Sequence, residues 1–331
     1  MTVDRTISKR HKAKRIAIYN HKGGVGKTTL TINIAFALKR LGKSVLLVDS
    51  DPQCNLTSYL VAANEVDKML DASETSTGRT LWSAIKPVAE GTGEAHLIRP
   101  IDANGLLLLP GDIQLNNFEQ DLYQFWSESF LRRVRGYRGT AAMSALVNEI
   151  SAAYGVDYVF YDSGPNIGPL NRSILLDCDY FIVPAACDSF SIRAFKTLGE
   201  TLADWVRNWS TAASLAPDNV YLLPGKPMMI GYLPQRFRVY GGSVASNYSG
   251  YLPLIDKRIS ADVGAVLREV DKSLAPLEYQ SRLGLVRDFG RLAGMGQDAG
   301  QAIWEVGNQE ENSRAWTVFH GIAKKIIERT S

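Results

Sequence analysis

The 331-residue sequence lacks any apolar run that approaches the roughly 20 residues needed to cross a bilayer. Its first residues also lack the apolar segment of a secretory signal peptide. From these two absences we expect a cytoplasmic protein with no membrane partner.

Cysteine is scarce as well. The three cysteines, Cys54, Cys178 and Cys187, are odd in number, and no two of them have CxxC spacing. This pattern indicates neither a disulfide framework nor a zinc site. We expect reduced thiols in or near the core, where cysteine behaves as a small apolar residue.

A strong net charge is also missing, since the formal charge is +3, with 45% hydrophobic and 21% charged residues. These values are ordinary for a globular protein and exclude the disordered and collagen-like classes.

The excess of basic residues lies at the start of the chain, where residues 1–15 carry six Lys or Arg and a single acidic residue. Such a basic arm can bind phosphate backbones or acidic surfaces, but the composition is equally consistent with a solvated tail that binds nothing.

No internal repeat or low-complexity tract is present, and apolar β-prone runs alternate with stretches of helical spacing. The predicted strands are "RIAIYN" (15–20), "SVLLVDSD" (44–51), "GLLLLPG" (105–111), "VDYVFYDS" (156–163), "DYFIVPAA" (179–186) and "PMMIGYLP" (227–234). Continuous rather than alternating apolar strands favour a parallel sheet that is covered on both faces. We therefore predict an α/β fold with a doubly wound, mostly parallel sheet flanked by helices.

Two segments, 62–104 and 235–262, are the least regular, and the second is rich in Gly, Ser and Tyr. The predicted organisation is a basic tail (1–14) followed by a single domain (15–331) that carries these two insertions. A last helix, about 311–329, has apolar residues near one face and is expected to pack against the core.

The stretch "YNHKGGVGKTTL" (19–30) carries the clearest chemistry. In the general phosphate loop, GxxxxGK[ST], backbone N–H groups and a helix N-terminus hold phosphate oxygens, a lysine neutralises them and a hydroxyl holds Mg²⁺. His21 stands where the opening glycine belongs, whereas the variant KGGxGK[ST] fits completely with an added lysine at Lys22. Because the loop follows a predicted strand and opens a predicted helix, it predicts a nucleotide site.

This loop resembles that of the ParA/MinD family of partition and positioning ATPases, whose deviant phosphate loop begins with such a lysine. The resemblance implies a P-loop NTPase fold, weak Mg²⁺-dependent ATP hydrolysis and an ATP-bound homodimer. It also implies that Lys22 reaches the phosphates of the partner's nucleotide, comparable in logic to an arginine finger. The implied nucleotide-binding residues of the loop are Lys22, Gly23, Gly24, Val25, Gly26, Lys27, Thr28 and Thr29.

Aspartates follow two of the predicted strands, near where the phosphates lie in an open α/β sheet. "LLVDSDPQCNLTS" (46–58) resembles the family's DxDPQxNxT segment, which implies that Asp51 activates the attacking water and that Asp49 supports the Mg²⁺ shell. "YVFYDSGPNIGPL" (158–170) resembles the family's DxPP segment, which makes Asp162 a further metal residue beside Thr28. Gly164 replaces the first proline of that segment, which leaves the rigidity of the segment open.

Two further resemblances concern the residues that would contact the adenine base of the nucleotide and those that would contact DNA. "MIGYLPQRF" (229–237) resembles the strand whose end lines the adenine site in the family, which nominates Pro234 and Gln235. "VRDFGRL" (286–292) resembles the family's "PRNVRL" with one residue inserted and nominates Arg287 and Arg291 for DNA contact. "LRRVRGYRG" (131–139) adds a second cluster, with Tyr137 interleaved, that suits a polyanion or a solvated face. Its arginines are Arg132, Arg133, Arg135 and Arg138.

The favoured interpretation is a DNA-associated positioning ATPase of the ParA type. It would bind DNA non-specifically at the nucleoid and segregate or position a plasmid, chromosome or other cargo, with a ParB-like or other partner that stimulates hydrolysis. The main alternative is a nucleotide-dependent regulatory switch that does not bind DNA. An iron–sulfur reductase is a third possibility, but Cys178 and Cys187 do not fall where paired cluster ligands are needed.

Overall fold

The computed structural model describes residues 13–237, 239–240, 243–244, 250–275 and 282–331. Residues 1–12, which hold most of the predicted basic tail, lie outside the described residues. So do parts of the predicted insertion at 235–262.

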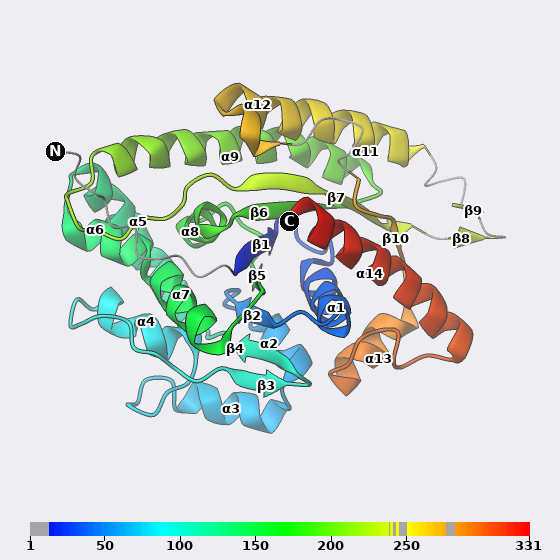
Figure 1. Ribbon diagram of the computed structural model, residues 1–331, viewed down its shortest axis with the longest axis horizontal. Coiled ribbons are helices and arrows are strands. Elements are labelled where there is room, and N and C mark those ends of the chain that lie inside the picture. The colour runs from blue at the N-terminus through cyan, green and yellow to red at the C-terminus, as the bar shows by residue number, and fades with distance from the viewer. Residues whose placement is uncertain (1–12, 238, 241–242, 245–249, 276–281) are drawn as a thin grey trace.

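An eight-stranded sheet runs through the molecule in the order β10-β7-β6-β1-β5-β2-β4-β3 (Figure 1). Every neighbouring pair is parallel except the antiparallel pair β3–β4. The strands are β1 (Lys14–Ile18), β2 (Val45–Asp49), β3 (Ile101–Ala103), β4 (Leu106–Leu109), β5 (Tyr158–Asp162), β6 (Tyr180–Ala186), β7 (Met228–Phe237) and β10 (Val286–Arg287). A separate pair consists of β8 (Val239–Tyr240) and β9 (Ser243–Val244). The predicted doubly wound, mostly parallel sheet is confirmed.

Helices cover both faces of this sheet (Figure 1). On one face lie α1 (Lys27–Arg40), α2 (Asn55–Leu60), α13 (Arg291–Ala299) and α14 (Gln309–Arg329). On the other face lie α4 (Leu81–Ala89), α5 (Leu115–Phe130), α6 (Val134–Thr140), α7 (Ala142–Tyr154), α8 (Pro169–Asp177), α9 (Ser189–Ser214), α11 (Tyr251–Ile259), the π-helix η1 (Ser260–Ala265) and α12 (Val266–Val270). The remaining helices are α3 (Ala63–Asp71) and the short 3₁₀ helix η2 (Lys272–Leu274).

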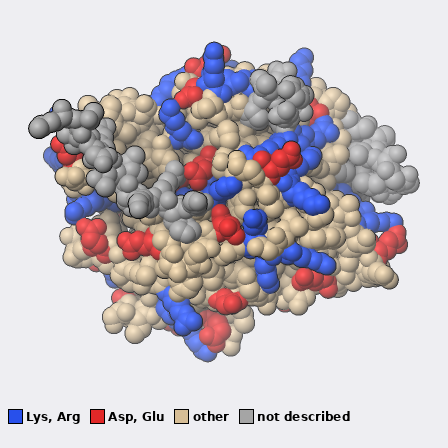
Figure 2. Space-filling view, in the orientation of Figure 1, with Lys and Arg blue, Asp and Glu red and all other residues tan. Residues whose placement is uncertain are grey.

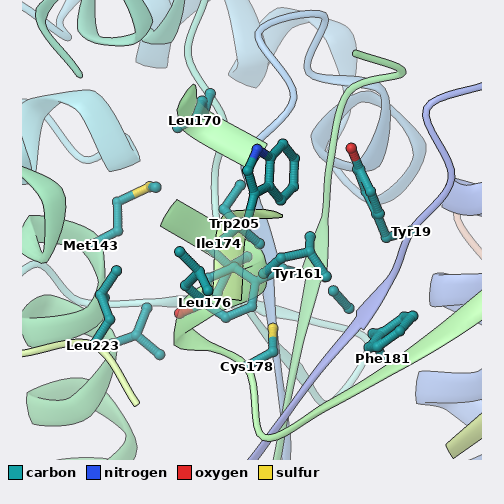
Figure 3. Packing of buried hydrophobic residues seen from close by; sticks show 14 of the residues in the cluster. Tyr19, Met143, Tyr161, Leu170, Ile174, Leu176, Cys178, Phe181, Trp205 and Leu223 are labelled. Carbon is teal, nitrogen blue, oxygen red and sulfur yellow. The ribbon is translucent and has the colours of Figure 1, made fainter. Parts of the chain in front are cut away.

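Side-chain alternation along the central strands divides the core into two halves. In β1, Ile16 and Ile18 pack with α1 and α14, whereas Ala17 packs on the opposite side with the cluster that includes Trp205. Both sets are fully buried, which explains why the strand is an unbroken apolar run in the sequence. Figure 3 shows part of the second cluster, where Tyr161 of β5 and Ile174 of α8 meet.

The six predicted strands and the last helix are all present, with ends that differ by a few residues. Four short strands, β3, β8, β9 and β10, were not predicted, because two or three residues are too few to show a period. The segment 62–104 is more regular than expected, since it contains α3, α4 and β3. No helix among the described residues is long and apolar enough to span a bilayer.

Arg15 corrects one expectation, because it was counted with the basic start of the chain but lies buried in β1. Its guanidinium forms an ion pair with the buried Asp177 at the end of α8 and donates to Ser144 Oγ at 2.9 Å. Asp177 also accepts hydrogen bonds from Ser144 Oγ and from the Tyr161 hydroxyl, each at 2.5 Å. This network ties β1, β5, α7 and α8 together.

We expect Asp177→Ala to lower the free energy of unfolding by about 3–5 kcal/mol, because it leaves the Arg15 guanidinium buried without its counter-ion. Denaturant unfolding followed by circular dichroism measures the change. Glu65→Ala is the control, since the Glu65–Lys68 pair is mostly exposed and should contribute little. Equal, small effects of the two substitutions would contradict a stabilising role of the buried network.

Candidate functional site

The carboxyl ends of the central parallel strands meet at one edge of the sheet, where ligands bind in open α/β folds. The loop 19–26 follows β1, and the aspartates Asp49 and Asp162 end β2 and β5. β2 and β5 are adjacent, and their register pairs Asp49 with Asp162. The topology therefore brings these sequence-predicted residues to one place.

The phosphate-type loop has the backbone shape that its glycines predict. Gly24 and Gly26 both have φ of 69°, a left-handed conformation in which a Cβ would be strained. Lys27 Nζ turns back over the loop and donates to the carbonyls of Asn20 at 3.1 Å and Lys22 at 3.4 Å. The first turn of α1 has no acidic side chain and no side-chain cap. The loop and the start of α1 thus present backbone N–H groups and one lysine to an anion.

Lys27 is buried, and this burial lowers the pKa of its ammonium, although the nearby Asp162 and Asp51 oppose the shift. Gly23, Val25, Thr28 and Thr29 lie in the same loop or in the first turn of α1. All of the loop residues that the sequence nominated therefore lie at the sheet edge where Asp49 and Asp162 end their strands.

Two buried carboxylates lie beside the first turn of α1. Thr28 Oγ1 donates to Asp162 Oδ2 at 2.7 Å. Asp49 Oδ2 accepts from the Thr57 backbone N–H at 2.8 Å and from Thr57 Oγ1 at 2.5 Å. Burial raises the pKa of Asp49 to about 7, and burial together with the charge of Asp49 raises the pKa of Asp162 to about 8. The site therefore disfavours two bare negative charges.

The oxygen atoms available here fit Mg²⁺. Asp49 Oδ1 and Asp162 Oδ1 are buried and have no hydrogen-bond partner within the described part of the chain. Nowhere in that part do three or more His, Cys, Asp or Glu side chains form a metal-binding group. Mg²⁺ suits such a place because it is bound through one or two carboxylates together with substrate phosphates, rather than by a cage of protein ligands.

Asp51 is held close to the loop after β5. Its Oδ1 accepts from the Gln53 backbone N–H at 3.0 Å. A Cβ added at Gly164 would lie 3.4 Å from Asp51 Oδ1, and one added at Gly23 would lie 3.7 Å from Pro165 Cβ. The segment 163–168 therefore lies against both Asp51 and the phosphate-type loop.

Lys22 points away from its own loop. Its Nζ donates to both carboxylate oxygens of Asp188 at 2.7 Å and to Ser191 Oγ at 2.9 Å. Asp188 also caps α9 by accepting from the Ser191 backbone N–H at 2.7 Å. The sequence analysis missed Asp188, although an aspartate just before a helical stretch is a standard N-cap signal.

Gln235 lies at the phosphate-type loop. A Cβ added at Gly26 would be 2.7 Å from Gln235 Oε1, and Gln235 Nε2 is buried with no partner among the described residues. Its neighbour Pro234 pairs in register with Ala185 of β6. The predicted contact of Pro234 and Gln235 with an adenine base stays a prediction.

The two arginine clusters are not brought together, since α6 and α13 lie at opposite ends of the long axis in Figure 1. Several of these arginines already have partners in the chain. Arg135 and Arg133 lie 3.0 and 3.9 Å from Glu128, and Arg291 forms a 2.7 Å ion pair with Glu311. Arg132 Nε donates to the Leu215 carbonyl at 3.2 Å, Arg138 lies 3.2 Å from Glu94, and the Arg287 guanidinium lies 5.2 Å from the Phe289 ring centroid.

Tyr137 corrects the interpretation of the 131–139 cluster as basic residues with an interleaved aromatic. It is fully buried and donates to the carbonyls of Ser129 at 2.7 Å and Ala212 at 2.8 Å, so it is not available to stack on a ligand. On the face drawn in Figure 2, acidic side chains lie among the basic ones.

Comparison with known proteins places this site in a family. The family described as "AAA domain" matches residues 13–212. The chain is 29% identical over 233 residues to the chromosome-partitioning ATPase Soj of Thermus thermophilus. It is 30% identical over 190 residues to the sporulation initiation inhibitor protein Soj of Bacillus subtilis. These alignments cover 70% and 57% of this chain, and 79% and 64% of the two relatives.

Solved structures share the fold. A protein of Corynebacterium diphtheriae superposes with a TM-score of 0.71 at 24% identity, covering 96% of this chain and 98% of that one. An ATP complex of a McdA variant from Cyanothece gives 0.61 at 18% identity, with coverage of 95% and 96%. Cobyrinic acid a,c-diamide synthase of Mycobacterium smegmatis with bound ADP and magnesium gives 0.51 at 26%, with coverage of 74% and 82%.

The match to the "AAA domain" family covers more than half of the chain, and the relatives include two Soj proteins. The chain therefore belongs to the ParA/MinD family of deviant Walker A ATPases.

Proposed function

We propose that this protein is a Mg²⁺-dependent ATPase whose triphosphate state is a homodimer. The observation that carries the proposal is the convergence of Lys27, Asp51, Asp49 and Asp162 at one sheet edge, beside the glycine loop that opens α1. Bound nucleotides in two neighbour structures, ATP in McdA and ADP with magnesium in the diamide synthase, support the choice of ligand.

Each of these residues has a role in the proposed hydrolysis. The loop amides and Lys27 bind the phosphates, and Asp51 accepts a hydrogen bond from a water and orients it. The water oxygen bonds to the γ-phosphorus while the bond to the β,γ-bridging oxygen breaks, so ADP leaves with the electron pair and the water's proton passes to a phosphate oxygen. Thr28, Asp162 and Asp49 would hold Mg²⁺, which neutralises phosphate charge when bound.

Lys22 supplies the proposed link to assembly. It is held by Asp188 and Ser191 rather than over its own loop, which leaves its cation available for the nucleotide of a second copy. A γ-phosphate in a closed interface needs cations to offset its charge. Loss of that phosphate by hydrolysis then weakens the interface and returns the protein to monomers.

We further propose that the dimer binds DNA non-specifically, at the nucleoid in the cytoplasm, and that a ParB-like or other partner stimulates hydrolysis. The T. thermophilus relative is named a chromosome-partitioning ATPase, which supports DNA as the cargo or track. The candidate contacts are Arg287, Arg291, Arg132, Arg133 and Arg135. The alternative is a regulatory switch that ignores DNA, and the intramolecular partners of Arg133, Arg135 and Arg291 favour it.

Asp51→Ala is expected to bind ATP but to lower the hydrolysis rate by about 100-fold or more, because the attacking water loses its positioning group. ATP then persists and traps the dimer. Size-exclusion chromatography with light scattering, run with ATP or ADP and with or without duplex DNA, measures this outcome.

Lys27→Ala is the control for that experiment, because it removes the phosphate-binding lysine and should abolish nucleotide binding and dimer formation. An Asp51→Ala protein that stays monomeric with ATP would contradict the switch. Dimers that form with ATP but do not shift with DNA would support the alternative function. Binding to arbitrary duplexes that weakens steeply with salt would support the DNA-associated one.

Lys22→Ala should lose ATP-dependent dimerisation and about 100-fold or more in hydrolysis, while monomeric ATP affinity stays the same. Asp188→Asn is the matched variant, because it breaks the same ion pair but keeps the lysine. We expect Asp188→Asn to dimerise with ATP at least as readily as the parent protein. Equal losses in the two variants would mean that the ion pair has only a structural role, and the proposed action of Lys22 in the partner's site would be wrong.

A further inference from the structure

The segment 163–168 forms one wall of the candidate site without the proline that the resemblance leads one to expect at position 164. Gly164 lies against Asp51, and Pro165 lies against Gly23 of the phosphate-type loop. A small displacement of this backbone would therefore change the surroundings of Asp51. Glycine itself does not restrict the backbone, so other contacts must hold the segment.

Asn171, on the first turns of α8, supplies three such contacts. The two N–H groups of its Nδ2 are shared among three acceptors: the Gly164 carbonyl at 2.9 Å, the Asn166 carbonyl at 3.0 Å and Asn166 Oδ1 at 2.7 Å. Asn166 Oδ1 in turn accepts from the Gly168 backbone N–H at 2.9 Å. Asn171 is 1% exposed, so water does not readily replace these bonds.

Tyr19 reaches the same point from the other side. Its hydroxyl donates to the Asn166 carbonyl at 2.9 Å. Tyr19 directly follows β1, and the centroid of its ring lies 6.0 Å from that of Trp205 on α9. Figure 3 labels both side chains. The Asn166 carbonyl is therefore shared by the helix after the segment and by the residue that begins the phosphate-type loop.

We propose that Asn171 is a positioning residue that, together with Tyr19, holds the segment 163–168 against Asp51 in place of the missing proline. This inference rests on the proposed ATPase function, in which Asp51 orients the attacking water. Asn171 acts through the backbone of Gly164 and Asn166, and these hydrogen bonds of its side chain involve no residue of the phosphate-type loop. Its loss should therefore affect the turnover rate and leave ATP affinity unchanged.

Asn171→Ala tests the inference, with Ser173→Ala as the matched control on the same helix. The Ser173 hydroxyl is buried and has no partner among the described residues, so its removal breaks no such bond. We expect Asn171→Ala to lower kcat about tenfold and to change KM for ATP less than twofold. Hydrogen–deuterium exchange of the nucleotide-free protein should be faster in 163–168 in this variant and unchanged in Ser173→Ala.

Tyr19→Phe gives a second, milder test, because it removes one hydroxyl, keeps the ring against Trp205 and carries the test if Asn171→Ala does not fold. It should lower kcat and speed exchange in the same segment. When both variants fold, the double variant should be no slower than Asn171→Ala, because the segment is already released. Effects that multiply would mean that the two residues act independently, and the shared role would be overturned.

The failure of the inference differs from the failure of the proposed function. If the parent protein hydrolyses ATP no faster than Lys27→Ala, the ATPase function fails, and exchange in 163–168 still reports whether Asn171 holds the segment. If the parent protein is active and Asn171→Ala matches Ser173→Ala in both kcat and exchange, the inference is wrong.

Discussion

The register between β2 and β5, which sets Asp49 opposite Asp162, constrains the rest of the sheet edge. Both carboxylates are buried, and this burial raises the pKa of each because it opposes the ionised form. Three features relieve this opposition: the hydrogen bonds from Thr57, the hydrogen bond from Thr28 and the proximity of Lys27. A cation at this point would relieve it further. The arrangement thus favours a ligand that brings its own positive charge, as a magnesium–nucleotide complex does.

The two lysines of one loop have opposite environments. Lys27 is buried and donates to backbone carbonyls of its own loop, whereas Lys22 is partly exposed and pairs with the carboxylate of Asp188 beside α9. An ion pair with this much exposure contributes little to stability, since water and salt screen it. Breaking the Lys22–Asp188 pair therefore costs little energy, as the proposed role of Lys22 in a second subunit requires. Lys27 has no comparable freedom, which suits a residue that binds the nucleotide within a single subunit.

Local patterns in the sequence predicted the central strands and the loop well, because both depend on neighbouring residues. Unbroken apolar runs mark strands buried on two faces, and the glycines of the loop meet a local backbone requirement at Gly24 and Gly26. Arg15 and Tyr137 were misjudged for the opposite reason. What buries them is a distant partner: Asp177 for the arginine, and the Ser129 and Ala212 carbonyls for the tyrosine. Residue type and spacing contain no information about such tertiary contacts, and the same holds for the pairing of Asp188 with Lys22 and for the contacts of Asn171.

The replacement of a proline by Gly164 changes how the wall of the site is kept in place. Proline restricts a backbone locally and permanently, whereas the bonds from Asn171 and Tyr19 are tertiary and reversible. Each of them depends on where α8 and the start of the phosphate-type loop lie. A rearrangement of that loop on binding phosphate would therefore reach the Asn166 carbonyl through Tyr19 and the Gly164 carbonyl through Asn171, and Gly164 lies against Asp51. A proline at position 164 would restrict this backbone by itself, whereas the hydrogen-bonded segment would follow its neighbours and so couple Asp51 to them in the proposed function.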